Sequence, residues 1–371
     1  MDIVEVTEGR TRFFVPRQDP HLQFPPGGGP VFYNPRMELN RDVTILLLSV
    51  LRPEDYLDAM GASGARGLRV AHEIGIPVTI NDWSQRAVDL ARQNVERLGL
   101  SAEVTHSDAN ALMSVRKFDA VDLDPFGTPA PFVDAAARSA GRYLFVTATD
   151  TAPLCGAHLK AGMRRYFSRP RNTEYHAEVG LRTLLGFVVR EVIKYDRGVE
   201  PLFCYAHEHF HRLHLRLRDG AAAADRTLAR IGYIMQCRDC LYRTEQTGLL
   251  PEPEECPLCG ADLVPVGPLW TGRINDDPTL AAMEELLPLV NVGNRARIAR
   301  LLSTCRQELE TSSHYDYHVI AKSLRVSPGS IETVIERLVG LGYRASRAHY
   351  SGTAIKTDAP LSVLEKVISG G

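Results

Sequence analysis

The segment FDAVDLDPFGTPAPF, residues 118–132, decides the fold class and the chemistry expected of this chain. It opens with alternating apolar and acidic residues, which predict a strand whose Val121 and Leu123 face the core. The strand pattern stops at Asp124-Pro125-Phe126. Most such triplets are simple turns in which the aspartate caps and the aromatic ring fills the core. The surrounding elements must therefore distinguish a turn from a functional site.

Strand and helix patterns alternate around this segment, from about Asp55 to Asp150. Helices are expected to end at Gly75 and Gly99, and Ser84 marks the start of the second one. The alternation predicts an α/β, Rossmann-like fold with a parallel, doubly wound sheet and ligand sites at the carboxyl ends of its strands. The expected strands are YLDAM (56–60), PVTIND (77–82), EVTHSD (103–108), FDAVDLD (118–124) and YLFVTATD (143–150).

The glycine-rich segment DAMGASGARG follows the first expected strand. Such a turn lets a ligand approach the backbone and opens a helix whose amino end attracts negative charge. The spacing of Gly61, Gly64 and Gly67 lacks the close first pair of the dinucleotide fingerprint G-x-G-x-x-G. A smaller cofactor with an amino-acid end, such as S-adenosylmethionine, is therefore favoured.

Carboxylates end the next two expected strands. Asp82 is placed to bind ribose hydroxyls, and Asp108 to accept from an adenine amino group, with the backbone of Ala109 beside it. The alternative for both acids is a helix cap. Arg41 and Arg66 are candidates to neutralise the cofactor's carboxylate, with solvated salt bridges as the alternative.

Asp124-Pro125-Phe126 would then lie where the transferable methyl group points. An exocyclic amino nitrogen on a base is a poor nucleophile, because its lone pair is delocalised into the ring. The Asp124 carboxylate and a carbonyl of the proline turn can hold its hydrogens, and Phe126 offers a platform for a flipped base. These residues predict an amino group on a base as the methyl acceptor. The segment FPPGGGP, residues 24–30, is expected to be a surface connection or, alternatively, a loop over the pocket.

The segment DPFGTPAPFVDAA, residues 124–136, resembles the catalytic signature of the tRNA (guanine-N2-)-dimethyltransferases. The segments VFYNPRMELNRDVT, DAMGASGARGLR and GTAIKTDAP are also similar to sequence blocks of that family. The resemblance implies two methyl transfers from S-adenosylmethionine to N2 of guanosine 26 in tRNA. It places the catalytic role on Asp124, supported by Pro125 and Phe126, and it assigns the cofactor contacts to Arg41, Arg66, Asp82, Asp108 and Ala109.

Two C-x-x-C pairs, separated by fifteen residues, account for four of the seven cysteines. This spacing favours one structural Zn²⁺ held by four thiolates, over a redox pair or an iron–sulfur centre. The expected ligands are Cys237, Cys240, Cys256 and Cys259. Without the metal this segment is expected to unfold locally, because it has almost no core of its own.

The C-terminal pattern, over about residues 310–360, is a helix followed by two short strands and resembles a winged helix. Arg344, Arg347, His349 and Lys356 are expected to place positive charge along the wing. Basic segments at 163–171 and 294–300 are further candidates for tRNA contacts, although charged stretches are usually only solvated surfaces. The segment HRLHLRLRDG (211–220) predicts a half-exposed strand with a basic outer face.

We therefore expect a methyltransferase domain at 1–225 and a smaller α+β, tRNA-binding region at 226–371, with the zinc ribbon at 237–259. The chain has 371 residues, 44% of them hydrophobic, and its 43 basic and 45 acidic side chains nearly balance, so any nucleic-acid surface must be local. The acidic first residues lack a signal-peptide pattern, and the run 45–51 is too short for a membrane span. These features and the reduced cysteines indicate a cytoplasmic protein, and no protein partner is implied.

Two other functions fit the same residues. One is an amino methyltransferase that acts on guanine or adenine in rRNA or DNA. The other is a non-catalytic nucleic-acid-binding protein, with a zinc ribbon and an inactive methyltransferase fold. The three acids Asp82, Asp108 and Asp124 argue against the second alternative, because an inactive site has no need of them.

Overall fold

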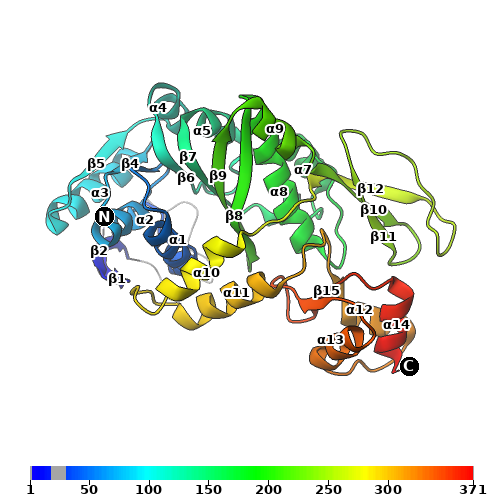
Figure 1. Cartoon of the computed structure of the whole chain (residues 1–371). Helices are drawn as coiled ribbons and strands as arrows, with labels where there is room; N and C mark the ends of the chain where they lie inside the picture. The colour runs from blue at the N-terminus through cyan, green and yellow to red at the C-terminus, as the bar shows by residue number, and fades with distance from the viewer. Residues whose placement is uncertain (1, 18–30, 371) are drawn as a thin grey trace. The chain divides into compact units, whose positions relative to one another are not determined.

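The computed structural model describes residues 2–17 and 31–370, so the segment FPPGGGP lies outside the described residues. Contacts divide the chain into two units. The first contains residues 1–147, 214–217 and 277–302, and the second contains residues 148–213, 218–276 and 303–371. Figure 1 labels the helices and strands of both units. The expected domain boundary after residue 225 stays a prediction.

The first unit is built on a parallel sheet, as the sequence predicted. Its five parallel strands run in the order β5-β4-β3-β6-β7, and the middle of β9 (Phe210–Asp219) follows β7. The order reverses direction between β3 and β6, and this is where α/β sheets bind ligands. The strands are β3 (Tyr56–Asp58), β4 (Val78–Asp82), β5 (Ala102–His106), β6 (Phe118–Leu123) and β7 (Ala140–Ala148).

Helices connect these strands, and a hairpin precedes them. The apolar positions of α3 face inward, with Val88 and Ala91 almost fully buried. Gly75 and Gly99 end their helices at positive φ, +74° and +61°, as expected of glycine at a helix end. The elements are β1 (Ile3–Glu8), β2 (Thr11–Pro16), η1 (Pro35–Met37), α1 (Glu38–Leu51), α2 (Ala65–Arg69), η2 (Val70–Ile74), α3 (Gln85–Leu98), α4 (Ala109–Val115), η3 (Ala130–Phe132), α5 (Val133–Ser139), α10 (Asp277–Leu286) and most of α11 (Arg295–Gln307).

The second unit is centred on the long buried helix α8, which packs against β8 and β12. It holds two small sheets, in the orders β11-β10-β12 and β13-β15-β14, and both are antiparallel. Its elements are α6 (Thr151–Leu154), α7 (Leu159–Tyr166), α8 (His176–Ile193), β8 (Arg197–His207), α9 (Ala221–Leu228), β10 (Ile231–Cys237), β11 (Arg243–Thr247), β12 (Leu263–Trp270), β13 (Tyr315–Asp316), α12 (Tyr317–Leu324), α13 (Ile331–Gly340), β14 (Ala345–Arg347), β15 (Ala354–Thr357) and α14 (Leu361–Ser369).

The prediction of a half-exposed strand with a basic outer face at β9 is wrong for Arg212 and His214, whereas Arg216 is partly exposed and Arg218 is exposed. Arg212 and His214 have 0% of their surface exposed. In the second unit, Gly180 of α8 lies so close to His211 that an added Cβ would come within 2.8 Å of the imidazole ring. In the first unit, the His214 ring packs against Phe145 at 5.2 Å. The expected outer face of β9 is therefore covered at Arg212 and His214 and reaches solvent only toward the end of the strand.

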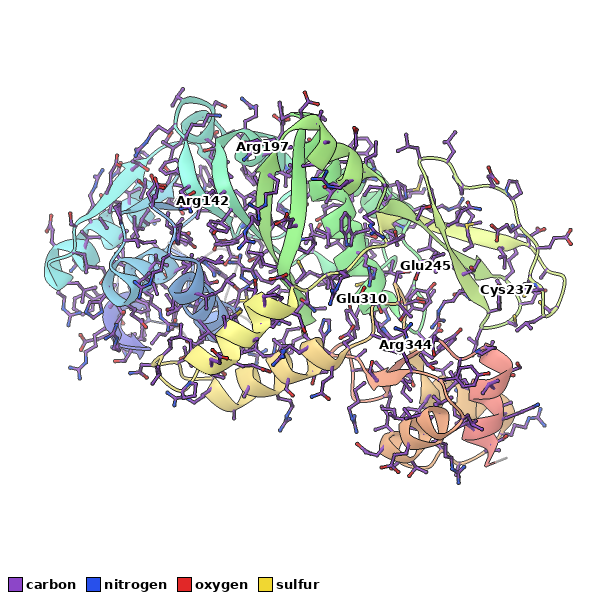
Figure 2. The ribbon with its side chains drawn as sticks, viewed as in Figure 1. Arg142, Arg197, Cys237, Glu245, Glu310 and Arg344 are labelled. Carbon is purple, nitrogen blue, oxygen red and sulfur yellow. The ribbon has the colours of Figure 1, made fainter. Side chains whose placement is uncertain are left out.

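The expected positive charge of the wing is also partly wrong. Lys356 is buried, 2.7 Å from a Glu178 oxygen and 2.9 Å from a Glu308 oxygen, and the His349 ring bonds Glu308 at 2.7 Å. Burial raises the pKa of Glu178, but the charges of Lys356 and Arg182 outweigh burial and hold this pKa well below its usual range. Only Arg344 (Figure 2) and Arg347 are exposed, each in a surface ion pair.

No helix in the described part of the chain is long and apolar enough to cross a membrane.

Candidate active site and metal centre

The glycine-rich turn connects β3 to α2 at the centre of the parallel sheet. A Cβ added at Gly61 or Gly67 would lie 2.6 or 2.5 Å from the Ile80 side chain of β4, so only glycine allows this close approach. Gly64 precedes α2 at a φ of +78°. The turn therefore brings the start of α2 directly against the neighbouring strand.

Asp58, the last residue of β3, anchors this turn. Its Oδ2 accepts a hydrogen bond of 2.9 Å from the Gly67 amide. Burial raises the pKa of Asp58 to about 7, with the Arg66 charge opposing this effect and Asp122 adding to it. Asp58 was not among the site residues predicted from the sequence, although its position directly before the glycine turn was a usable signal.

The register of the parallel strands places two of the expected acids at the same level, at the carboxyl ends of β4 and β6. Asp58 pairs with Ile80 of β4 and with Asp122 of β6. Asp82 and Asp124 each follow two residues later, so Asp82 is the last residue of β4 and Asp124 directly follows β6. Asp82, which was expected to bind the ribose, and Asp124, the expected catalytic acid, thus lie at the same edge of the sheet, on either side of the glycine turn.

Asp82 and Asp108 both bond local backbone amides. The two Asp82 oxygens accept from Ala62 and from Ser84, each at 2.8 Å, which ties Asp82 to the glycine turn. Asp108 is exposed and caps α4, its Oδ1 accepting from Ala111 at 3.0 Å. A carboxylate oxygen accepts more than one hydrogen bond, so these bonds leave acceptor sites for a ligand.

Arg66 joins the glycine turn to Asp124. It extends from α2, donates from Nη1 to Asn40 at 3.0 Å and to Thr44 at 2.7 Å, and donates from Nη2 to the Asp124 carboxylate. Arg66 is 5% exposed and Asp124 is 21% exposed. The arginine that was expected to meet the cofactor's carboxylate therefore pairs with the expected catalytic acid.

Arg41 lies in a different buried ion pair. Its Nε and Nη2 donate to the two oxygens of Glu8, at 2.7 and 2.5 Å, and Nη2 also donates to the Asn34 carbonyl at 3.1 Å. Tyr33 donates to the same carboxylate at 2.7 Å. The Arg41 charge is thus compensated by the β1–β2 hairpin.

The ring of Phe126 projects from the turn after β6 and is 77% exposed. It meets Phe32 edge to face, with the ring centroids 5.7 Å apart. Gly127 follows at a φ of +91°, and Pro125 is buried. Phe32 was not among the site residues predicted from the sequence, because nothing in its local pattern connects it with Phe126, which is far away in the chain.

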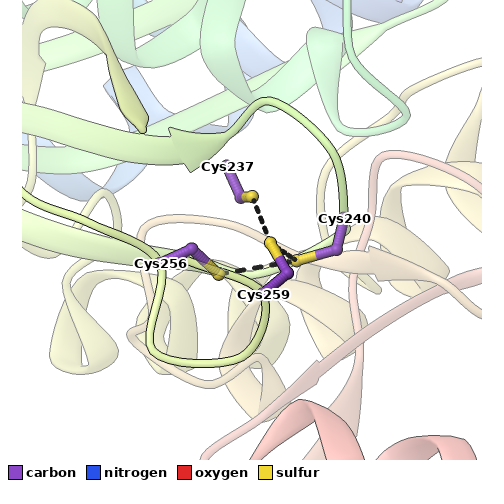
Figure 3. Close-up of side chains that lie close together, drawn as sticks. All are labelled: Cys237, Cys240, Cys256 and Cys259. Atoms are coloured by element: carbon purple, nitrogen blue, oxygen red, sulfur yellow. Dashed lines mark hydrogen bonds between the residues drawn. The ribbon is translucent and has the colours of Figure 1, made fainter. Parts of the chain in front are cut away.

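The four cysteines of the second unit converge on one point (Figure 3). Their sulfurs lie 3.5 Å apart for Cys237 and Cys259, 3.6 Å for Cys240 and Cys256, and 3.9 Å for Cys240 and Cys259. Thiolates bound tetrahedrally at 2.3 Å from a zinc ion would be about 3.8 Å apart. The distances are far longer than a disulfide bond and fit a four-thiolate metal site.

The central sheet and the edge site define the class of protein. The fold is that of the S-adenosylmethionine-dependent methyltransferases. It is similar to the structure of Trm1 from Pyrococcus horikoshii in complex with S-adenosyl-L-methionine. That similarity has a TM-score of 0.89 at 37% identity and covers 99% of this chain and 100% of the other.

The chain belongs to the N2,N2-dimethylguanosine tRNA methyltransferase family, whose profile matches residues 9–369. It is 86% identical, over the full length of both chains, to the tRNA (guanine(26)-N(2))-dimethyltransferase of Methanoculleus marisnigri. It is 62% identical to the enzyme of the same name from Methanoregula boonei, over 100% of this chain and 99% of the relative.

Proposed function

We propose that this protein transfers two methyl groups from S-adenosylmethionine to the exocyclic N2 of guanosine 26 in tRNA. The observation that carries the proposal is the position of Asp124 and Phe126. They directly follow β6, at the sheet edge that also holds the glycine turn and Asp82. Family membership and the names of the full-length relatives support the tRNA substrate and the guanosine position.

The glycine turn and the acids beside it suit S-adenosylmethionine. Asp82 would accept from the ribose hydroxyls, and Asp108, with the Ala109 amide, would contact the adenine. Arg66 would meet the carboxylate of the bound cofactor. Arg41, the other candidate for this role, would have to exchange its ion pair with Glu8 for that carboxylate. When bound, the cofactor supplies an electrophilic methyl group on sulfur.

Asp124 would accept a hydrogen bond from the guanine N2 amino group and turn its lone pair toward the methyl carbon. The Pro125 carbonyl would accept from the second N–H. Phe126 would stack on the flipped base, and the nearby Phe32 ring would contact it from another side. The N2 proton released in each transfer would pass to Asp124 or to water.

The second unit would hold the metal and contact the tRNA. Zn²⁺ bound by Cys237, Cys240, Cys256 and Cys259 would be structural, because four protein ligands leave no open position. The helix α13, followed by β14 and β15, supports the winged-helix interpretation of the C-terminal region. In the first unit, the basic stretch of α11, with Arg297 and Arg300 exposed, would also contact tRNA phosphates. A cytoplasmic location is part of the proposal.

Methyl transfer from labelled S-adenosylmethionine into unmodified tRNA, followed by nucleoside analysis, tests the proposal. The expected product is N2,N2-dimethylguanosine, which disappears when guanosine 26 is replaced by adenosine. Label in rRNA or DNA but not in tRNA would contradict the substrate. Absence of cofactor binding in calorimetry would contradict the enzyme itself. The affinity for tRNA should also fall steeply with salt, and a flat response would exclude binding through phosphates.

A further inference from the structure

The helix α7 of the second unit presents a mixed basic and apolar stripe to solvent. Lys160, Met163, Arg164 and Phe167 follow one another at helical spacing, and all four are exposed. Met163 is 47% exposed and Phe167 is 70% exposed. In a stable globular protein, large apolar side chains surrounded by cations on one face indicate a binding surface.

The opposite face of α7 holds the helix firmly in place. The Tyr166 hydroxyl donates to Asp150 at 2.6 Å, and its ring packs edge to face on Phe187 of α8. A Cβ added at Gly162 would lie 2.6 Å from the Pro153 carbonyl, so the helix packs closely on α6. The exposed stripe is therefore part of a rigid element, which lowers the entropy lost when it binds a partner.

Phe167 is held with its ring outward by a strained backbone. Its φ is +46°, a left-handed conformation that a bulky residue rarely adopts. Arg190 of α8 stabilises this turn by donating to the Phe167 carbonyl at 3.1 Å and to the Tyr166 carbonyl at 2.6 Å. Strain of this kind persists where the surrounding structure enforces it, and it often marks a functional position.

The charges around the ring are free to meet an anion. Lys160, Arg164 and Arg169 have no hydrogen bond or ion pair through their side chains anywhere in the described ranges 2–17 and 31–370. Only Arg165 is paired, with Asp150 at 3.0 Å. Two hydrogen bonds with Gly267 fix the Arg169 backbone, and therefore the point from which its side chain extends.

We propose that the Phe167 ring stacks on an unpaired base of the tRNA while Lys160, Arg164 and Arg169 contact the flanking phosphates. An exposed aromatic ring with cations around it is the arrangement that binds single-stranded nucleic acid, because the ring takes a base face and the cations take the backbone. The inference rests on the proposed function, and it adds a contact separate from the site at Asp124.

The test compares full-length variants for their binding to unmodified tRNA over a series of KCl concentrations. Phe167→Asn removes the ring but keeps a residue that tolerates the left-handed backbone, and Phe167→Trp keeps a stacking ring. Val115→Asn is the matched control, because Val115 is equally accessible, at 81% exposed, but lies on a helix without these charges. A triple glutamine variant at Lys160, Arg164 and Arg169 tests the cations.

We expect Phe167→Asn to raise the Kd for tRNA roughly 10-fold with no change in the salt slope, since stacking is not electrostatic. Phe167→Trp and Val115→Asn should bind as the wild type does. The triple variant should flatten the salt slope by about 2 to 3. Calorimetry with S-adenosylmethionine should give the same Kd for all variants.

Wild-type affinity for tRNA in Phe167→Asn would overturn the inference and leave α7 as a protein-docking surface. Equal losses in Phe167→Asn and Phe167→Trp would also overturn it, because the turn rather than the ring would then matter. In both cases methylation of guanosine 26 by the wild type would show that the proposed function itself stands. A wild type without any tRNA binding would remove both proposals together.

Discussion

Arg66 of α2 and Asp124, which directly follows β6, form a partly buried ion pair, which joins the glycine turn to the expected catalytic acid. The same guanidinium group lies 3.8 Å from Asp122 and bonds Asn40 and Thr44. The geometry of the acceptor site therefore depends on the residue that was expected to bind the cofactor. Because the two residues are coupled, their roles can be separated only if each variant is tested for both methyl transfer and cofactor binding.

Asp124→Ala should reduce methyl transfer by roughly 10²-fold or more, because the guanine amino group loses its charged acceptor. The cofactor Kd should remain within a few-fold of the wild-type value. Single-turnover transfer rates and calorimetry measure the two effects, and Asp124→Asn is the control that keeps a neutral acceptor. Comparable losses of rate and cofactor affinity would place Asp124 in the cofactor pocket instead.

Arg66→Met should lower the free energy of unfolding by about 3–5 kcal/mol, because Asp122 and Asp124 would lose their buried countercharge. Arg138 provides the matched control, since it pairs with Asp134 on the surface of α5, and the two side chains are 38% and 45% exposed. Arg138→Met should cost only about 0–1 kcal/mol. Urea denaturation measures the free energy of unfolding of both variants. Equal losses would show that the Arg66 pair contributes no more to stability than a surface ion pair.

Asp82→Ala should weaken cofactor binding by roughly 1–3 kcal/mol through lost hydrogen bonds to the ribose. Because Asp82 also bonds the amides of Ala62 and Ser84, some of the loss will come from the glycine turn. S-adenosylmethionine and a ribose-modified analogue, titrated by calorimetry, separate the two contributions. A variant that binds both ligands as the wild type does would refute the placement of Asp82.

Asp58 should make stability depend on pH. Its pKa is about 7 in the folded protein, against about 3.9 for an unperturbed aspartate. Between these values the folded form holds a proton that the unfolded form has released, so the free energy of unfolding decreases as pH rises. The loss is at most about 1.4 kcal/mol per pH unit, is absent below pH 4 and is complete above pH 7.

Urea denaturation of the wild type and Asp58→Asn at several pH values between 4 and 7.5 measures this contribution. Asparagine keeps an acceptor for the Gly67 amide but does not titrate. The wild type should lose stability relative to the variant as pH rises. Parallel curves for the two proteins would show that Asp58 does not bind the expected proton.

Removal of the metal should unfold the segment 237–259 without unfolding the parallel sheet of the first unit. The cysteine segment has only a small apolar cluster, to which Cys237 and Cys256 themselves belong. Elemental analysis should find one zinc per chain, and a chelator should raise hydrogen exchange mainly in this segment. Cys259→Ser should lose the metal, whereas Cys204→Ser should keep it. A metal-free protein with unchanged exchange would contradict the structural role.

The local patterns of the sequence predicted the parallel sheet well. The periodicity of strands and helices and the helix-ending Gly75 and Gly99 are short-range signals. Because the sheet is buried on both faces, the apolar pattern of its strands is strong. The same kind of argument failed at Arg212 and Lys356. Both are long, charged side chains, and a charge is expected at the surface unless a distant partner compensates it.

The sequence alone determined the succession of strands and helices along the chain, the glycine turn, the acids at the strand ends and the spacing of the four cysteines, because each depends on neighbours in the chain. Tertiary structure decided which charges are buried and what they meet. The sequence does not specify which anion Arg66 meets, and the structure shows that Asp124 after β6 is its partner. Phe32 lies at the site only through its contact with Phe126. Such pairs join residues far apart in the chain, and no local pattern specifies them.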